Sequence, residues 1–556
     1  MADFAKRQLA GEYAVPVLIC GGGPVGLALA AELGFQRVNC VLVEQGDGGV
    51  PVPKMSQLTT RTMEFCRRWG IAEQVKKAGW PENHPCDFVY ATSLTGYELY
   101  RQKSPSYAQR PQLGYSPEGP RHCPQIFFDP VLLEHVSWLP TITLRHRTRM
   151  DSFVEESDGV AVNLTDLESG EMETIRTCYL VGCDGFDGLT RKALGIEYGG
   201  EGVLSFSVSI FFRSAELATL HDKGWARFFR LIDASGHWGD LVSIDGRELW
   251  RLTELRINCD ADISSFDVES CLRKAMGANF SYEVLSVLPW KRRGLVARRY
   301  GRGRVFLAGD AVHQSSPTSG LGMNTGLGDA VDLGWKLAAI IEGWGGEMLL
   351  ESYGAERMPV GMASVADSDR TYHETTLLCG GSAITQCSAE GERQRRRFAE
   401  DLLGRTQGKS DPTSENVKLG YCYDNSPIIR SDGTSGPPRD VWDFVPSARP
   451  GSRAPHAWVG ENRSLLDLFG HGFVLLRFGA DPVSVEPLAR AAAARAVPLQ
   501  VVDITNPDIE RLYERKLVLV RPDGHVAWRG DDCPANALTL MDVVRGKFFG
   551  GSQRNA

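Results

Sequence analysis

The chain has 556 residues, of which 42% are hydrophobic and 23% charged, and its formal net charge is -8. This length exceeds one ordinary core and predicts two or three domains, between which a large ligand can be buried. The acidic balance argues against a nucleic-acid or anionic-membrane surface, because both need concentrated Lys and Arg. We therefore expect a small-molecule partner, with neither nucleic acid nor membrane.

Targeting and metal signals are missing from the sequence. No apolar run reaches the roughly 18 to 20 residues of a membrane span, and the first fifteen residues lack a signal-peptide core. These observations predict a cytoplasmic protein. The 13 cysteines are scattered, and no pair has the C-x-x-C spacing of zinc or redox sites. We expect reduced structural thiols and no metal.

An apolar run, a glycine-rich turn and a second apolar run follow one another near the N-terminus. This order is typical of a strand, a turn and a helix that bind a dinucleotide. Gly21 permits the sharp turn, Gly23 lets the backbone approach a pyrophosphate, and Gly26 lets the helix pack closely on the strand. The diphosphate would meet the helix N-terminus at Pro24 and Val25.

A second strand is predicted about twenty residues further on, where Val41-Leu42-Val43 is followed by Glu44. An acidic residue at this place accepts hydrogen bonds from a ribose, so Glu44 suits the adenosine half of a dinucleotide. The turn and Glu44 alone do not separate FAD from NAD.

The separation comes from a downstream segment, residues 303–310, which is typical of a short buried strand ending in Gly-Asp. Asp310 at the strand end can bind a ribityl hydroxyl. A helical pattern follows, and its first backbone N–H groups, at Gly322, Met323 and Asn324, would face the pyrimidine end of a flavin. The helix dipole would stabilise the negative charge of the reduced ring there.

A third motif, Asp184-Gly185 followed by Arg191, lies between these two. In this order and at these separations, the three motifs resemble those of the FAD-dependent aromatic-ring hydroxylases, and the similarity spans roughly residues 13–370. The resemblance implies FAD as cofactor and NADPH or NADH as co-substrate, with the Asp-Gly segment serving both. It also implies that no separate NAD(P)H domain is present, and the sequence has no second G-x-G-x-x-G after a strand.

The resemblance assigns further contacts to the cofactor. Arg61 matches an arginine near the flavin, and Gln125 matches a glutamine on the adenine side. Gln45 follows Glu44 where many members have arginine, which puts one adenosine contact in doubt. The predicted cofactor-binding residues are therefore Gly21, Gly23, Pro24, Val25, Gly26, Glu44, Gln45, Arg61, Gln125, Asp184, Gly185, Arg191, Asp310, Gly322, Met323 and Asn324.

The chemistry that the resemblance implies is hydroxylation of a phenol, with NAD(P)H, O2 and a C4a-hydroperoxyflavin. The protein must then exclude water and favour removal of the phenolic proton. Pro317 matches a backbone proline close to the reacting flavin edge. Ser56 stands where related phenol hydroxylases have an acid or a histidine; it either orients the hydroxyl, passes a proton through water, or is a simple turn serine.

Three further residues are candidates with equally good structural explanations. His313 follows the Gly-Asp motif and either reaches the flavin edge or is a buried structural histidine. Trp250 and Arg251 lie in a strand-like segment and either line the substrate pocket or follow from strand alternation alone.

The expected fold class is α/β, or α+β overall, with a Rossmann-like FAD-binding domain, an interleaved β-sheet substrate domain and a thioredoxin-like C-terminal domain. The last resembles that of the phenol-hydroxylase branch, around Arg521-Pro522-Asp523-Gly524, with packing or homodimer support as its role. The boundaries that we predict are 13–80, 120–195 and 295–370 for FAD, 81–119 and 196–294 for substrate, 371–431 for a helical extension and linker, and 452–548 for the C-terminal domain.

Two other functions stay open at this point. A Baeyer–Villiger or epoxidising monooxygenase would use the same scaffold, and FAD motifs do not decide between them. A non-catalytic flavoprotein would leave the nicotinamide-associated Asp-Gly motif without a use. A flavin-dependent halogenase is disfavoured because the sequence has no W-x-W-x-I-P segment.

Overall fold

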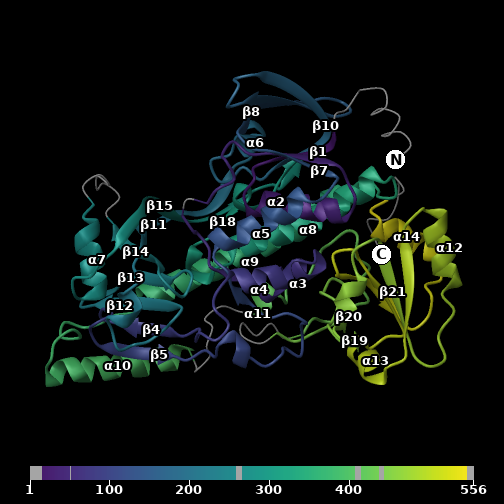
Figure 1. Ribbon diagram of the computed structural model, residues 1–556. Helices are drawn as coiled ribbons and strands as arrows, with labels where there is room; N and C mark the ends of the chain where they lie inside the picture. Colours follow the sequence, from purple (N-terminus) through teal and green to yellow (C-terminus); the bar gives the residue numbers. More distant parts are fainter. Residues whose placement is uncertain (1–14, 51, 258–265, 407–414, 438–443, 548–556) are drawn as a thin grey trace.

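The computed structural model of the protein describes residues 15–50, 52–257, 266–406, 415–437 and 444–547 (Figure 1). Its mixed α/β architecture confirms the expected fold class. Residues 13 and 548, at which we placed the outer limits of the FAD-binding and C-terminal domains, lie outside the described residues.

The first sheet has a parallel centre in the order β17-β10-β1-β2-β7. These strands span Val305–Leu307 (β17), Met172–Gly182 (β10), Val15–Cys20 (β1), Cys40–Val43 (β2) and Ile142–Arg145 (β7). In the register of the sheet, Cys20 lies beside Gly182, and Gly182 lies beside Leu307. The three motifs, far apart in sequence, therefore leave the sheet at one carboxyl edge, where α/β folds bind their ligands.

Helices cover this sheet. Helix α2 (Pro24–Phe35) packs against α8 (Gly322–Ile341) and α5 (Gln125–Ser137), and α9 (Met348–Thr376) packs against α8. Residues Val25 to Leu33 of α2 are all buried, which matches a sequence that is apolar around the helix except at Glu32. The burial also fixes the N-terminus of α2 at the sheet edge.

The second sheet has eight strands in the order β18-β15-β11-β14-β13-β12-β4-β5. They span His313–Gln314 (β18), Glu283–Ala297 (β15), Tyr198–Arg213 (β11), Leu249–Ile257 (β14), Gly236–Ser243 (β13), Phe228–Asp233 (β12), Phe88–Ala91 (β4) and Glu98–Gln102 (β5). Because β18 directly follows the Gly-Asp motif, the sheet is joined to the cofactor side of the molecule. Trp250 and Leu252 of β14 pack in a hydrophobic cluster that also holds α7 (Val268–Met276).

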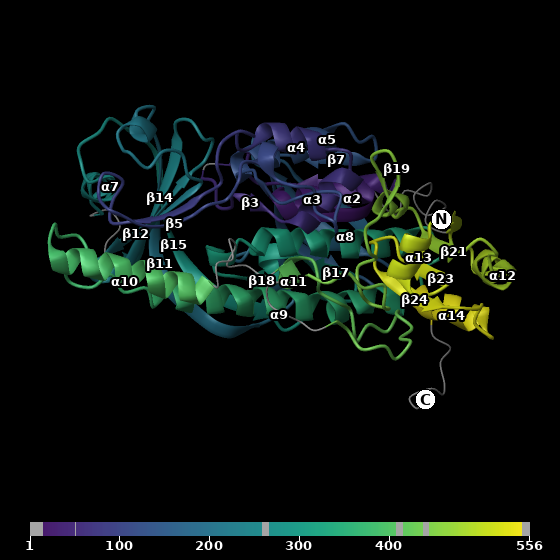
Figure 2. The ribbon, with the colours of Figure 1, turned by 90° about the horizontal axis from the view of Figure 1, so that it is seen from below.

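The C-terminal unit is a four-stranded sheet in the order β22-β21-β23-β24. Its elements are β21 (Phe473–Phe478), α12 (Glu486–Ala494), β22 (Leu499–Ile504), α13 (Pro507–Tyr513), β23 (Leu517–Val520), β24 (Val526–Gly530) and α14 (Ala537–Val544). Hydrophobic clusters lie on both of its faces, and one of them includes Trp335 of α8. In Figure 2 this unit, in yellow, lies at one end of α8 and α9.

The remaining helices and strands are short or peripheral. They are β3 (Gln57–Leu58), α3 (Thr60–Arg68), α4 (Ala72–Ala78), β6 (Arg121–His122), β8 (Thr148–Glu155), β9 (Val160–Asp166), α6 (Leu189–Ala193), β16 (Gly301–Arg302), α10 (Ala389–Thr406), α11 (Glu415–Lys418), β19 (Trp458–Gly460) and β20 (Arg463–Ser464). Among the described residues, no helix is both long and apolar enough to cross a membrane.

Candidate active site

One cavity joins the carboxyl edge of the first sheet to the second sheet. Its atom-free volume is about 1660 Å³, the open mouth included. Motif residues of the first sheet and side chains of the second sheet share this lining, which is where a cofactor and its substrate are expected to meet. The sequence-predicted residues that line it are Gly23, Pro24, Val25, Ser56, Gln125, Gly185, Arg251, Asp310, Pro317, Gly322 and Met323.

The glycine-rich turn has the geometry that its three glycines predict. Gly21 has φ of +108°, and a Cβ on it would lie 2.4 Å from the carbonyl oxygen of Cys183. A Cβ on Gly26 would lie 1.9 Å from the carbonyl oxygen of Gly21, because α2 packs that closely on the turn. A Cβ on Gly23 would meet nothing within 4 Å. The turn is thus tight on the protein side and open on the cavity side, which fits a pyrophosphate at the start of α2.

The acidic residue after β2 contacts the same turn. Glu44 accepts hydrogen bonds from the backbone N–H of Gly22 at 2.7 Å and of Gly46 at 2.6 Å. Glu44 does not line the cavity, and Gln45 is exposed. A ribose contact at Glu44 stays a prediction.

The Asp-Gly motif places only its glycine in the cavity wall. Asp184 accepts hydrogen bonds from the backbone N–H and the hydroxyl of Thr190, both at 2.8 Å, and so caps the start of α6. Its other oxygen, Oδ1, is buried without a hydrogen-bond partner in the described residues. Arg191 donates to the carbonyl of Ile196 at 2.6 Å and stacks on Tyr198. The structure therefore shows Asp184 and Arg191 shaping the loop that carries Gly185.

A buried carboxylate, Asp329, lies next to the Gly-Asp motif and accepts a hydrogen bond from the backbone N–H of Gly309 at 3.2 Å. Asp310 is exposed at the cavity. His313 is fully buried, and its Nε2 lies 2.9 Å from Oδ2 of Asp329, while Arg357 donates to Oδ1 of Asp329 at 2.9 Å. Burial would raise the pKa of Asp329, but His313 and Arg357 hold that pKa below its ordinary value. His313 does not line the cavity, so the structure favours its interpretation as a structural histidine.

The start of α8 is fixed by Asn324, which uses all of its amide atoms. Its Oδ1 accepts from the backbone N–H of Thr59 at 2.9 Å and the hydroxyl of Thr62 at 2.6 Å. Its Nδ2 donates to the carbonyls of Gln57 at 2.9 Å and Gly320 at 2.7 Å. Gln57 and Gly320 line the cavity, whereas Asn324 does not. Its side chain therefore joins two cavity walls.

Gln125 lines the cavity and is oriented by a buried carboxyl group. Its Nε2 donates to Oδ2 of Asp129 at 2.9 Å, while Oδ1 of Asp129 is buried without a partner in the described residues. Burial raises the pKa of Asp129 to about 7. The sequence did not single out Asp129, although it lies one helical turn after Gln125.

Arg61 faces the C-terminal unit and not the cavity. Its guanidinium donates to Glu64 at 2.8 Å and to the carbonyl of Asp523 at 2.7 Å, and only 7% of the residue is exposed. The expected place near the flavin is therefore not where the structure puts this side chain. At the start of the same helix α3, Thr59 and Thr62 contact Asn324, whereas Arg61 contacts Glu64 and Asp523.

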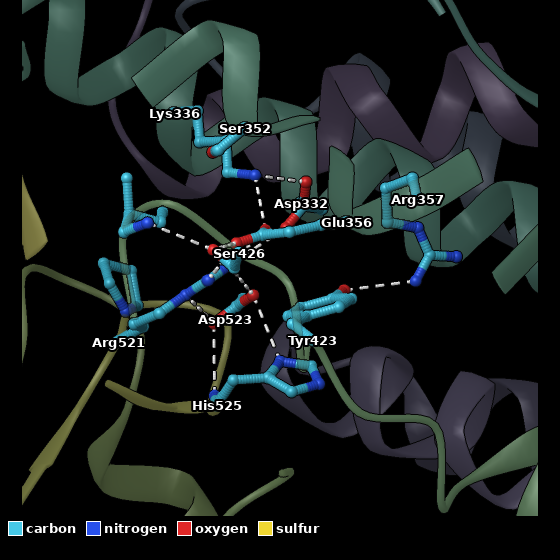
Figure 3. Close-up of polar contacts among 12 residues, drawn as sticks. Asp332, Lys336, Ser352, Glu356, Arg357, Tyr423, Ser426, Arg521, Asp523 and His525 are labelled. Atoms are coloured by element: carbon cyan, nitrogen blue, oxygen red, sulfur yellow. Dashed lines mark hydrogen bonds and ion pairs between the residues drawn. The ribbon is translucent and has the colours of Figure 1, made fainter. Parts of the chain in front are cut away.

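A buried ionic network fastens the C-terminal unit to α8 and α9 (Figure 3). Arg521 donates to both carboxylate oxygens of Glu356, at 2.6 and 2.9 Å, to Asp332 at 3.1 Å and to Asp523 at 2.7 Å. Lys336 contacts Asp332 at 2.7 Å and Glu356 at 2.6 Å. All five side chains are at most 3% exposed. The segment Arg521-Pro522-Asp523-Gly524, on which the resemblance to a C-terminal family domain rests, therefore attaches that unit to α8 and α9.

Strand alternation separates the two substrate candidates. Trp250 is 1% exposed and stacks on Trp225 at 5.8 Å on the side of the sheet that faces α7. Arg251 points to the opposite face, lines the cavity and donates to the carbonyl of Pro53. The suggestion that both line the pocket is therefore wrong for Trp250.

Several lining residues were missed by sequence reasoning. They are Lys54, Met55, Gln57, Phe88, Cys183, Arg227, Phe228, Arg230, Gln314, Ser315, Thr318, Ser319 and Gly320. Those near 54–57 and 314–320 neighbour predicted residues, so proximity in sequence was an available signal. Nothing local marks Phe88, Arg227 or Arg230, which reach the cavity through sheet pairing.

Known proteins share this architecture. Residues 14–368 match the family described as FAD binding domain, and residues 447–550 match the family described as aromatic-ring hydroxylase, C-terminal. The FAD-dependent monooxygenase apdD of Emericella nidulans is 31% identical over 93% of this chain and 87% of its own length. The 4-methyl-5-nitrocatechol 5-monooxygenase of a Burkholderia species is 32% identical over 96% of this chain and 97% of its own.

A solved structure agrees over nearly the whole chain. RebC soaked with chromopyrrolic acid, with bound 7-carboxy-K252c, has a TM-score of 0.89 and 41% identity, covering 96% of this chain and 99% of that one. The fold and site define an FAD-dependent oxidoreductase. The chain belongs to the aromatic-ring hydroxylase family of FAD-dependent monooxygenases, which confirms the resemblance found in its sequence.

Proposed function

We propose that this protein hydroxylates a phenolic aromatic substrate, using NADPH or NADH and O2 with FAD as its bound cofactor. One oxygen atom of O2 enters the ring and the other leaves as water, while one NAD(P)H and one proton are consumed. The observation that carries the proposal is a cavity whose lining combines residues of the three cofactor motifs with residues of the second sheet.

The motif residues would hold the cofactor by its different parts. Gly23 and the start of α2 would receive the pyrophosphate, for which the turn leaves open space. Asp310, exposed at the cavity, would bind the ribityl chain. Gly322 and Met323 would direct backbone N–H groups at the flavin, where the α8 dipole stabilises negative charge. Bound there, FAD supplies the redox chemistry that activates O2.

The substrate would occupy the part of the cavity under the second sheet. Phe88 and Phe228 line it and stack on each other at 5.0 Å, which offers an aromatic surface to a planar ring. Ser56 lines the same cavity. We assign Ser56 to orienting the phenolic hydroxyl, with Pro317 positioned beside the reacting edge.

The proposal is tested by product analysis. FAD-loaded protein is incubated with NADPH or NADH, ¹⁸O2 and a set of one- to four-ring phenols and catechols. A product that contains one ¹⁸O atom on its ring supports hydroxylation. An ester or epoxide formed from a ketone or alkene, with no ring product from any phenol, favours the Baeyer–Villiger or epoxidising alternative and contradicts the proposal.

A further inference from the structure

One wall of the cavity carries three arginines from the second sheet. Arg227 directly precedes β12, Arg230 lies within β12, and Arg251 lies in β14. Strand β13 lies between β12 and β14, where it places Asp240 opposite Arg230 and Val242 opposite Arg251. The sheet thus brings three guanidinium groups to a single wall.

These arginines have few acidic partners. Nε of Arg230 lies 3.3 Å from Oδ1 of Asp240, an oxygen that is also 2.8 Å from Nε2 of His237. Arg227 donates to the amide oxygen of Gln57 at 3.3 Å, and Arg251 donates to a backbone carbonyl. Within the described part of the chain, neither Arg227 nor Arg251 has a carboxylate within 4 Å.

The charge of the cavity is unbalanced as a result. Its described lining contains Lys54 and the three arginines, against one acidic residue, Asp310, which lies with the cofactor motifs. Arg227 and Arg230 are only 8% and 6% exposed. Arg227 has no ionic partner among the described residues, and Arg230 shares Asp240 with His237, so an anion that enters the cavity would offset part of the cost of burying these cations.

Burial also disfavours the charged form of Arg251. Desolvation lowers the pKa of Arg251 to about 10, in spite of the opposing effect of Asp240. Nε of Arg251 is also buried without a hydrogen-bond partner in the described residues. A donor group that is charged, desolvated and only partly used is ready for an anionic acceptor, and a planar guanidinium suits a carboxylate especially well.

We propose that Arg227, Arg230 and Arg251 form a carboxylate-binding subsite, so that the substrate is an aromatic acid. The inference rests on the proposed function and narrows its substrate class. The ring packs on Phe88 and Phe228, and its carboxylate pairs with the arginine wall. This arrangement fixes which edge of the ring is turned toward the flavin region, so the subsite also determines the position of oxygen transfer.

Equilibrium binding tests the subsite without turnover. FAD-loaded protein is titrated, without NAD(P)H, with two pairs of probes: salicylate and salicylamide, and 3-hydroxy-2-naphthoate and 3-hydroxy-2-naphthamide. Each pair keeps the phenol and changes only the charge, and binding is read from the flavin absorbance. In at least one pair, the acid is expected to bind about 10- to 100-fold more tightly than its amide. This ratio corresponds to the free energy of one hydrogen bond to a charged group.

Matched variants assign that preference to the wall. Arg230→Met and Arg251→Met keep side-chain bulk without charge and should lose the preference for the acid, whereas Arg251→Lys should retain part of it. Arg213→Met serves as the control, because Arg213 lies on β11 of the same sheet but is exposed and pairs with Glu283 at 2.6 Å. It should leave the preference unchanged. Retained flavin absorbance shows that each variant is folded.

The outcomes separate this inference from the proposed function. Equal binding of acid and amide in both pairs, or equal weakening of both by the Met variants, would overturn the subsite. The Met variants are also titrated with NAD⁺ and NADP⁺, and a loss of affinity confined to these nucleotides would overturn the subsite too, since the wall would then serve the co-substrate's phosphates. If the acid binds more tightly but no oxygenated product forms, the subsite stands and the hydroxylase function is contradicted. If neutral phenols are hydroxylated on the ring and the acid is not preferred, the hydroxylase function stands and the subsite is contradicted.

Discussion

The guanidinium of Arg521 forms a two-pronged contact with the carboxylate of Glu356, at 2.6 and 2.9 Å, although 165 residues separate them. Both side chains are fully buried. Arg521 belongs to the C-terminal unit and Glu356 to α9, the helix that runs beside α8 (Figure 2). The contact therefore couples the C-terminal unit to the helices behind the cofactor site.

Removal of Arg521 should destabilise the protein strongly. Arg521→Met leaves Glu356, Asp332 and Asp523 with too little positive charge, and breaking such a buried network typically costs about 3–5 kcal/mol. Urea unfolding measures this loss. Arg477→Met is the control, because Arg477 pairs with Asp503 at the surface, where a pair is worth at most about 1 kcal/mol. Similar losses in the two variants would contradict the structural role of Arg521.

Two alanine substitutions in the glycine turn should have different effects. Gly26→Ala puts a methyl group 1.9 Å from a backbone oxygen, so α2 must shift and both stability and FAD binding should fall. Gly23→Ala meets no protein atom within 4 Å, so the apoprotein should unfold at nearly the wild-type temperature. It should nevertheless bind FAD at least tenfold more weakly, because the methyl group occupies the approach to the pyrophosphate. Unweakened FAD binding by Gly23→Ala would show that the cofactor lies elsewhere.

Stability should depend on pH through Asp129. Its pKa of about 7 in the folded protein lies above its ordinary value, so between about pH 4 and pH 7 the folded state holds a proton that the unfolded chain has lost. Stability from this group is therefore lost as the pH rises through that window, by at most about 4 kcal/mol. Asp129→Asn cannot titrate and keeps an acceptor for Gln125. Thermal unfolding from pH 4 to pH 8 should show wild type falling relative to this variant, and parallel curves would refute the prediction.

Ser56 and His313 should affect different properties. Ser56→Ala should keep the unfolding temperature and lower kcat/KM for the phenol about tenfold, the equivalent of one hydrogen bond of about 1.4 kcal/mol. His313→Leu leaves the buried Asp329 short of a partner, so it should lower stability by about 1–3 kcal/mol. A stable His313→Leu protein with greatly reduced turnover would return His313 to the catalytic candidates.

The geometry of the glycine turn and the place of the Gly-Asp motif could be predicted from the sequence because their signals are local. Gly21, Gly23 and Gly26 act through backbone geometry within one turn, and Asp310 follows its strand directly, so spacing alone indicates where these residues lie. The C-terminal α/β unit was likewise visible from alternating strand and helix patterns.

The substrate side depends on pairings that no local pattern reveals. Arg230 reaches the cavity because β12 pairs with β13 and β4, and the face of β14 that carries Arg251 was undetermined until its partners were known. Arg61 illustrates the opposite error: its motif is local, but its contact with Asp523 depends on a unit more than 400 residues away. The roles of the predicted site residues toward FAD and substrate stay predictions.

The most direct test of the account is anaerobic stopped-flow reduction of the FAD-loaded protein by NADH and by NADPH, with and without aromatic acids and phenols, followed by mixing with O2. We predict faster flavin reduction with at least one of these compounds, and after mixing a product one oxygen atom heavier on its ring. If no aromatic compound accelerates reduction and no oxygenated ring is formed, the protein is not an aromatic-ring hydroxylase in function.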